Sequence, residues 1–226
     1  MNSYSYRNDP MFLRNQFETH GKFELPYISK QVFEFDCIEL IALSETKTND
    51  SPENCRKIVH GFLDDYRINR YYNYPERYRA KLSQYRALIS PDYSTWQEMN
   101  TWRGMEAVSH NRWVGKYWQE VWRMPVIPSV TWGSPVSYEY CFDGIERCCW
   151  VAISVVGTKR HRRAFIHGYD AMLEHISPDG IICLGRPYEE MRGNILSVPY
   201  KYPRHISSRS LCLPFIEYSI HTEIVR

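Results

Sequence analysis

The chain has 226 residues, which is enough for one large domain with a full hydrophobic core and somewhat short for two. Hydrophobic residues make up 43% of it and aromatic residues 15%, a composition that excludes an intrinsically disordered chain. The formal net charge of +2 requires neither a nucleic-acid partner nor an acidic one, so any basic function must come from local clustering.

The cysteines and the N-terminal residues indicate in which cellular compartment the protein is expected. The seven cysteines are odd in number, scattered, and several fall inside predicted strands, a pattern typical of reduced core thiols rather than of a secreted disulfide framework. Residues 1–13 lack the basic-then-apolar pattern of a secretory signal, and no stretch of about eighteen uninterrupted apolar residues occurs. We therefore expect a cytoplasmic protein with no membrane partner.

Short apolar runs rich in β-branched residues recur along the chain, and their length and content predict strands. In chain order they span residues 37–43, 58–63, 87–89, 126–130, 151–156, 181–184 and 195–198. Segments with helical character lie between most of them, at 75–85, 94–123, 136–142 and 162–176. Because the segment 94–123 contains Gly104 and Gly115, we expect it to break into two helices near Ser109, Asn111 and Arg112.

Alternation of helices with strands that are apolar throughout indicates a mainly parallel α/β sheet covered by helices on both faces. An incomplete (β/α) barrel and an open doubly wound sheet both fit this pattern. We expect a single domain. Residues 1–54 would form an N-terminal extension that includes the first strand and packs on the same domain, and residues 55–226 would form the α/β core.

Acidic residues follow two of the predicted strands. Asp64 and Asp65 come after the second strand, and Asp92 follows the third within a Ser-Pro-Asp turn. The carboxyl ends of parallel strands share one rim, where ligands of α/β proteins bind. The three acids could hold Mg²⁺ there or act as a catalytic acid and base, whereas the alternative is that they are helix caps or turn residues.

Two further segments reach the same predicted rim. Trp132, after the fourth predicted strand, would stack on a ring of the ligand or else cover the end of the sheet. After the strand at 151–156, Gly157 and Thr158 precede a basic run that includes Arg160 and opens a helix. A glycine and free N–H groups at a helix start favour a phosphate, although the spacing matches no named phosphate motif and a solvated basic helix start is the alternative.

Other motifs are weaker. The basic residues Lys201, Arg204, His205 and Arg209 are interleaved with tyrosines and could contact nucleic acid, or could form an exposed C-terminal loop. The chain contains neither Cys-x-x-Cys nor His-Glu-x-x-His, so we assign no metal ligands. The cofactor stays open, with Mg²⁺ as the ion that the acids would suit.

An ordered series of motifs resembles the phage and bacterial family catalogued as domain of unknown function 4417. The resemblance covers roughly residues 58–200. It rests on Phe62–Tyr66, Ile89–Ser94, Asn111–Trp113, Tyr117–Trp118, Val126–Pro128, Thr131–Gly133, Phe142–Ile145, Val155–Thr158, Gly168–Leu173 and Ile181–Gly185. It implies an origin in a phage, prophage or other mobile element, and it carries no activity, cofactor or catalytic residue with it.

Two functional hypotheses follow. In the first, the chain binds a phosphate-bearing, nucleotide-like ligand at the rim and acts on it if it is an enzyme: Asp64, Asp65 and Asp92 are catalytic, and the ligand-binding residues are Arg112, Trp132, Gly157, Thr158 and Arg160. In the second, it is a non-enzymatic accessory protein that contacts nucleic acid or a host protein through basic and aromatic surfaces. The sequence does not decide the oligomeric state.

Overall fold

The computed structural model describes residues 2–31 and 38–200, and its strands are short. They are β1 (Thr19–His20), β2 (Leu25–Pro26), β3 (Leu40–Ala42), β4 (Ile58–His60), β5 (Ala87–Ile89), β6 (Val126–Ile127), β7 (Trp150–Ser154), β8 (Gly180–Leu184) and β9 (Ile195–Val198). β1 and β2 form an antiparallel hairpin, whereas β3 to β9 pair in parallel. This confirms the predicted parallel α/β class.

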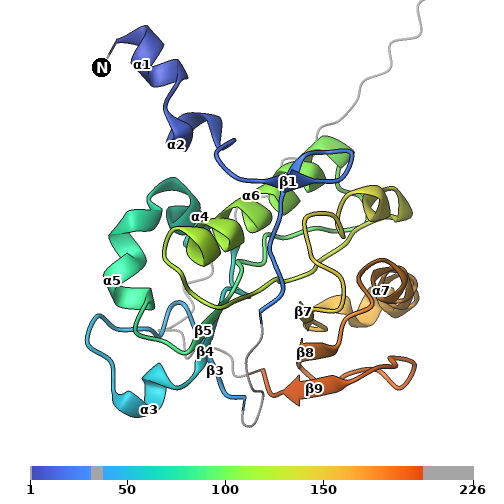
Figure 1. Ribbon diagram of the computed structural model, residues 1–226. Helices are drawn as coiled ribbons and strands as arrows, with labels where there is room; N and C mark the ends of the chain where they lie inside the picture. Colours follow the sequence, from blue (N-terminus) through green and yellow to red (C-terminus); the bar gives the residue numbers. More distant parts are fainter. Residues whose placement is uncertain (1, 32–37, 201–226) are drawn as a thin grey trace, which may run out of the picture.

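The parallel strands follow one another in chain order (Figure 1). β3 to β6 form one sheet and β7 to β9 a second, and a parallel bridge between Ser129 and Ala152 joins the two. A doubly wound sheet reverses its strand order, and these strands do not, so the incomplete barrel is the alternative that fits. Within the described ranges β3 and β9 do not pair to close it. We call β3 to β9 the half-barrel.

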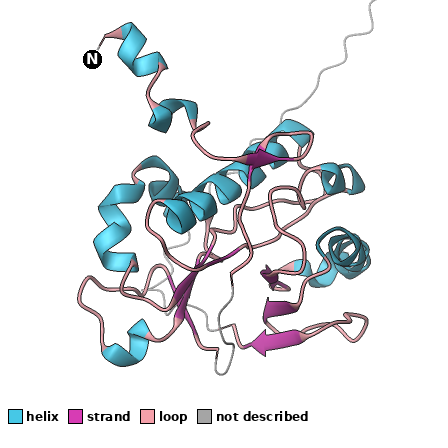
Figure 2. Ribbon diagram, viewed as in Figure 1, coloured by secondary structure: helices cyan, strands magenta, loops and turns pink. Residues whose placement is uncertain are grey.

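Helices surround the half-barrel (Figure 2). They are α1 (Ser3–Arg7), α2 (Pro10–Leu13), α3 (Pro52–Cys55), α4 (Asp65–Asn73), α5 (Arg79–Leu82), α6 (Thr101–Glu120) and α7 (Arg162–Ile176), with 3₁₀ helices η1 (Pro75–Tyr78), η2 (Pro135–Glu139) and η3 (Thr158–His161). α7 matches its predicted bounds, while α4 was not predicted. β3, within the predicted N-terminal extension, pairs with β4 of the predicted core.

Alternate strand residues point to opposite faces and enter separate cores. On one face, Val59, Leu88 and Val126 pack with the helices α4 and α6. β7 and β8 pack in the same way against α7. The third core is drawn from strands and the residues beside them, and we call it the inner cluster: Ile58, Phe62, Ala87, Ile89, Ile127, Ala152, Ile182 and Leu184. In the described residues, helices therefore cover the outer face, not both faces as we expected.

α6 is one continuous helix of 20 residues, so the predicted break near Ser109 is wrong. Both of its glycines lie at close contacts instead. A Cβ on Gly104 would overlap the Tyr140 hydroxyl, and one on Gly115 would lie 2.5 Å from Cδ1 of Ile28. The glycines let α6 approach its neighbours, and the packing gained outweighs their low helix propensity.

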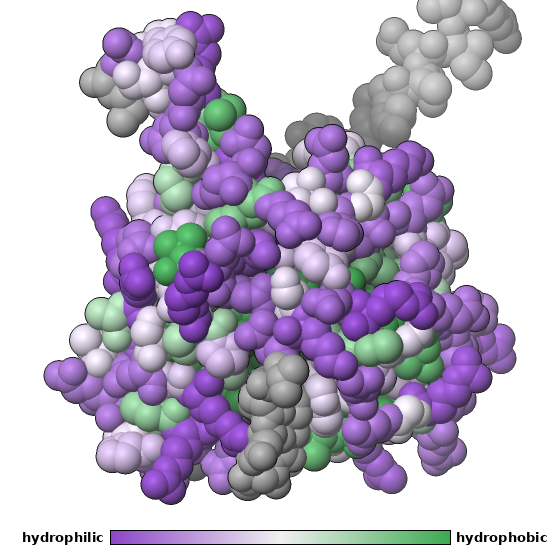
Figure 3. Space-filling model, viewed as in Figure 1, coloured by the Kyte–Doolittle hydropathy of each residue, from purple (hydrophilic) through white to green (hydrophobic). Residues whose placement is uncertain are grey.

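The N-terminal helices α1 and α2 project from the body and contain no buried residue (Figure 1). Arg14 anchors their base by donating a 2.9 Å hydrogen bond to the Tyr72 carbonyl and lying 3.9 Å from the Trp113 ring centroid. The face seen in Figure 3 is largely hydrophilic, with apolar residues in small scattered patches. Among the described helices, none combines the length and apolar content that crossing a membrane requires.

Candidate functional site

A cleft of about 600 Å³ opens at the carboxyl ends of β4, β5, β6 and β7. Its walls come from the loops after these strands, from the first turns of α4 and α7, and from Tyr200, two residues after β9. They are Phe62, Leu63, Asp64, Arg67, Asp92, Ser94, Thr95, Val130, Thr131, Trp132, Ser154, Val156, Thr158, Phe165 and Tyr200. Parallel pairing brings these segments, distant in sequence, to one rim.

Four of the sequence-predicted site residues line this cleft: Asp64, Asp92, Trp132 and Thr158. The other four do not. Asp65 and Gly157 each lie next in sequence to a lining residue, Arg160 is exposed, and Arg112 is buried behind the cleft. The basic residues from Lys201 to Arg209 lie outside the described residues.

Asp92 has the most perturbed carboxylate of the cleft. Its Oδ1 atom is buried and has no hydrogen-bond partner among the described residues. The pKa of Asp92 is raised to about 7, chiefly by burial and also by the nearby carboxylate of Asp65, while hydrogen bonding from the Ser129 side chain acts in the opposite direction. A carboxyl group with a pKa near neutrality can both donate and accept a proton at physiological pH.

A buried polar network lies directly behind Asp92. Asn111, from the middle of α6, donates through Nδ2 to the Pro91 carbonyl at 2.8 Å and to the Ser129 hydroxyl at 2.6 Å. Its Oδ1 accepts from Ser90 Oγ at 3.0 Å and from Arg112 Nη1 at 2.6 Å. These bonds fix the amide orientation of Asn111, and with it the two residues that flank and contact Asp92.

Arg112 is a structural member of this network. Its Nε donates to the Asp143 carbonyl at 2.9 Å, Nη2 donates to the Cys141 carbonyl at 2.7 Å, and Nη1 also reaches the Ser129 carbonyl at 3.1 Å. The side chain is about 1% exposed. Burial lowers its pKa to about 10, so it stays charged at neutral pH. These donors are used within the protein, and Arg112 is not among the residues that line the cleft.

The acids after β4 have different roles. Asp64 occupies the N-cap position of α4 without making a side-chain capping bond, and its side chain lines the cleft. Asp65 accepts two 3.0 Å hydrogen bonds, from the backbone N–H and the hydroxyl of Ser94. Asp65 thus ties α4 to the loop after β5, and Arg67, one turn along α4, contributes a cation to the cleft wall.

Trp132 forms part of the apolar wall. The indole is 7% exposed, lies 4.9 Å between ring centroids from Phe165, and packs so tightly on Gly168 of α7 that a Cβ there would overlap it. The ring is held against α7, and little of its surface is left exposed for stacking. This packing favours the second of our two alternatives, in which Trp132 covers the end of the sheet.

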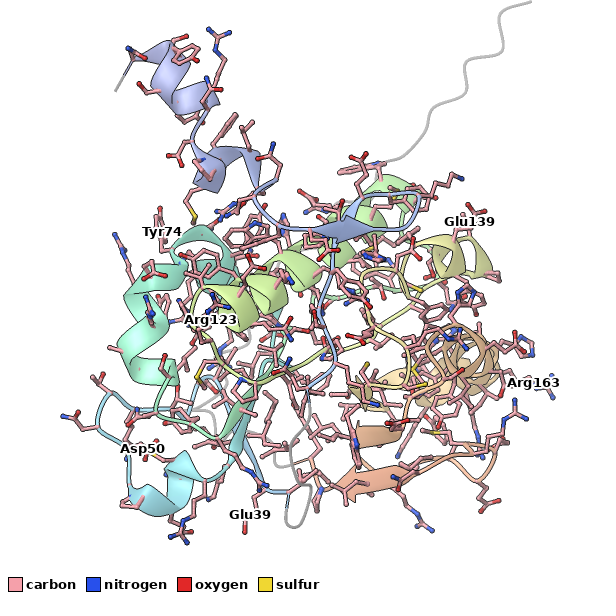
Figure 4. All side chains as sticks on the ribbon, in the orientation of Figure 1. Glu39, Asp50, Tyr74, Arg123, Glu139 and Arg163 are labelled. Carbon is pink, nitrogen blue, oxygen red and sulfur yellow. The ribbon has the colours of Figure 1, made fainter. Side chains whose placement is uncertain are left out.

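The turn after β7 is shaped by Gly157, which has φ +83°. The Thr158 hydroxyl donates to the Val155 carbonyl at 2.8 Å and lies 2.8 Å from the Tyr188 hydroxyl, so it holds the turn. No side chain caps the start of η3. The basic run that follows faces outward: Arg162 pairs with Glu190, and Arg163 projects at the edge of the molecule (Figure 4).

The described residues contain no group of three or more His, Cys, Asp or Glu side chains that could hold a metal ion. The cleft offers the pair Asp64 and Asp92. Two carboxylates are the number with which Mg²⁺ is commonly held when a substrate phosphate and water complete its coordination. These two acids are the residues that could hold such an ion together with a ligand.

Sequence reasoning missed Asn111 and Ser129 as the support of Asp92, and Arg67 as a cleft residue. Asn111 is a polar residue in the interior of a helix and lies between two buried glycines, Gly104 and Gly115. A polar side chain at such a position indicates a hydrogen-bond partner inside the protein. Arg67 follows Asp64 by three residues, so recognising α4 as a helix would have placed both near the same rim.

The half-barrel with a polar cleft at the carboxyl rim defines this protein as a parallel α/β protein with its strands in chain order. The model of one family, described as "Domain of unknown function (DUF4417)", matches residues 17–202, and the chain belongs to that family. This confirms the resemblance noted in the sequence.

Two relatives come from phages. The "Gene 1 protein" of Mycobacterium phage L5 is 30% identical over 181 residues, which cover 79% of this chain and 78% of the relative. The "Gene 1 protein" of Mycobacterium phage D29 is 29% identical over 181 residues, which cover 79% of this chain and 66% of the relative. The protein is thus related to phage proteins. No solved structure matches the chain.

Proposed function

We propose that this protein binds a phosphate-bearing small molecule, such as a nucleotide, in the rim cleft and acts on it by proton transfer at Asp92. The observation that carries the proposal is the state of Asp92, whose buried Oδ1 lacks a partner and whose pKa lies near 7 in a cleft of ligand size. A general acid or base is most effective when its pKa is close to the working pH.

The cleft wall supplies the remaining parts. Asp64 stands with Asp92 as a pair of oxygen ligands for a polar group or for Mg²⁺ bridging to phosphate. Arg67 contributes positive charge to the cleft wall, which favours a negatively charged group. Trp132 and Phe165 make part of the wall apolar, which suits an apolar part of the ligand. A ligand with a ring, hydroxyl groups and a phosphate uses all three kinds of surface.

Thermal unfolding against a panel of nucleotides, with and without Mg²⁺, tests this proposal, because a ligand specific for the native state raises the melting temperature by mass action. We expect at least one nucleotide to raise the Tm of the native chain. Asp92→Asn is expected to abolish the shift. The control is Asp170→Asn on α7, which removes an acid from an exposed ion pair with Arg192. This variant should preserve the shift in Tm.

A flat panel would overturn the nucleotide proposal and turn attention to nucleic acid or a host protein as the partner, contacted through basic and aromatic surfaces. The proposed setting is the cytoplasm of the host cell, where nucleotides are abundant. The free state of the described cysteines Cys55, Cys141, Cys148, Cys149 and Cys183 supports a reducing compartment.

A further inference from the structure

A second, smaller pocket of about 120 Å³ adjoins the cleft, since Leu63 and Arg67 line both. It lies beside the carboxyl end of β3, where Leu43 and Ser44 follow the strand. Its cations come from two helices: Arg67 and Arg70 are one turn apart on α4, and Lys81 is on α5. The pocket therefore occupies the same rim as the cleft, one strand further along the half-barrel.

In the part of the chain that the structure describes, the lining of this pocket contains three cations and no carboxylate. Among the described residues, Arg70 and Lys81 form no ion pair, and Nε of Arg70 donates to the Arg67 carbonyl at 2.8 Å. Burial lowers the pKa of Lys81, and the positive charge of Arg70 lowers it further. Arg70 and Lys81 are thus like charges whose mutual repulsion an anion would relieve.

The negative charge of Asp50 raises the pKa of Lys81, against the effects of burial and of Arg70. It lies outside the pocket lining, in the loop before α3 (Figure 4). Its carboxylate is occupied by the Tyr85 hydroxyl and by Nδ2 of Asn54, the latter at 2.8 Å. Asp50 therefore moderates the charge of the pocket without neutralising the cations from within it.

We propose that the pocket formed by Ser44, Arg67, Arg70 and Lys81 is a binding site for a phosphate group. Guanidinium groups and an ammonium group donate charge-assisted hydrogen bonds to phosphate oxygens, and a serine hydroxyl adds a neutral donor. The pocket is too small for a nucleoside, whereas the adjoining cleft has the volume for one. A ligand could thus place its phosphate here and the rest of its structure toward Asp92.

Binding of inorganic phosphate by this pocket stands by itself, while its use by the ligand of the cleft rests on the proposed function. Isothermal titration of the full chain with inorganic phosphate at low ionic strength measures the first. We expect Lys81→Gln and Arg70→Gln each to weaken binding by about tenfold, the effect of losing a charge-assisted hydrogen bond. The control Arg79→Gln removes an equal charge from α5 outside the pocket and should change binding less than about twofold.

The absence of measurable phosphate binding by the wild-type chain would overturn the proposal, as would an equal loss in Arg79→Gln. Asp92→Asn should leave inorganic phosphate binding intact, because Asp92 is outside the pocket lining. Binding of a nucleoside monophosphate is then compared with binding of its nucleoside. The comparison distinguishes a pocket that holds the phosphate of a larger ligand from one that holds free phosphate. If Lys81→Gln weakens the monophosphate but not the nucleoside, the pocket holds the tail of the ligand. Asp92-dependent nucleotide binding that Lys81→Gln does not affect would leave the proposed function standing and overturn the subsite.

Discussion

The side chain of Asn111 donates a 2.6 Å hydrogen bond to the hydroxyl of Ser129, and through that hydroxyl the interior of α6 reaches the acid of the cleft. A hydroxyl that accepts from an amide has its own proton left for another partner. Hydrogen bonding from Ser129 lowers the pKa of Asp92, which identifies Asp92 as that partner. The state of the cleft carboxylate therefore depends on a residue with no access to the cleft.

Asn111→Leu tests how much this network stabilises the fold. The substitution removes one buried hydrogen bond from each of the Ser129 hydroxyl, the Ser90 hydroxyl and Nη1 of Arg112, so we expect the free energy of unfolding to fall by about 3 kcal/mol. Urea denaturation measures it. Asn69→Leu, at an exposed position of α4, is the control and should change stability by less than about 0.5 kcal/mol. A loss in Asn111→Leu no larger than that of the control would contradict the role of the network.

Gly168→Ala tests the packing of the cleft wall. Its new Cβ overlaps Cδ1 and Nε1 of Trp132, and overpacking of this kind costs about 1–3 kcal/mol, against which the better helix propensity of alanine returns about 1 kcal/mol. We expect a net loss of stability together with a changed tryptophan fluorescence. In a double-mutant cycle, Trp132→Leu should recover part of the loss. Additivity of the two substitutions would show that the contact does not matter.

Stability should fall with rising pH because of Asp92. Its folded pKa of about 7 lies above its ordinary value of 3.8, so between pH 4 and pH 7 the folded state keeps a proton that the unfolded state has released. The stabilisation present below pH 4 is thus lost by pH 7. We expect Asp92→Asn to remove this slope and to become more stable relative to wild type across the window, by about 1–2 kcal/mol since the residue is partly exposed. Parallel pH profiles of the two chains would be inconsistent with a raised pKa.

His60 makes the stability of the fold depend on pH in the opposite direction. Burial lowers its pKa to about 4 from 6.5, and its Nδ1 is buried without a partner. Between pH 6.5 and pH 4 the unfolded state gains a proton that the folded state does not, so stability falls as the pH falls. We expect His60→Phe to lose this dependence, worth about 3 kcal/mol over the window. Urea denaturation at pH 4.5 and pH 6.5 compares the two chains, and an unchanged pH dependence would mean that His60 protonates freely in the fold.

Much of the fold follows from local pattern. β5 and β9 match their predicted bounds, because three or four apolar residues between turn signals have few alternatives in a parallel sheet. β6 ends before the predicted run does, and Pro128 follows it directly, a residue without the N–H that continued pairing needs. α4 was missed because its sequence is mostly Tyr, Arg and Asn, and just Ile68 and Tyr71 mark its buried side.

The cleft was predictable to the extent that topology determines it. Asp64, Asp92, Trp132 and Thr158 each follow a strand, and parallel strands share a rim whatever covers them. The hydrogen bonds of Asn111 and Ser129 that support Asp92 were not predictable in this way. Which side of α6 meets the rim depends on the close contacts at Gly104 and Gly115, and these distances are not contained in any local pattern.

The junction between the two sheets has a mechanical consequence. Two backbone hydrogen bonds, from Ala152 to Pro128 and from Val130 to Ala152, join halves that are each held by full ladders. The cleft spans this junction, with Thr131 and Trp132 on one side and Ser154 and Thr158 on the other. A ligand that contacts both sides of the junction links the two sheets to each other. Its arrival should slow amide exchange at Val130 and Ala152 more than at the centre of either sheet.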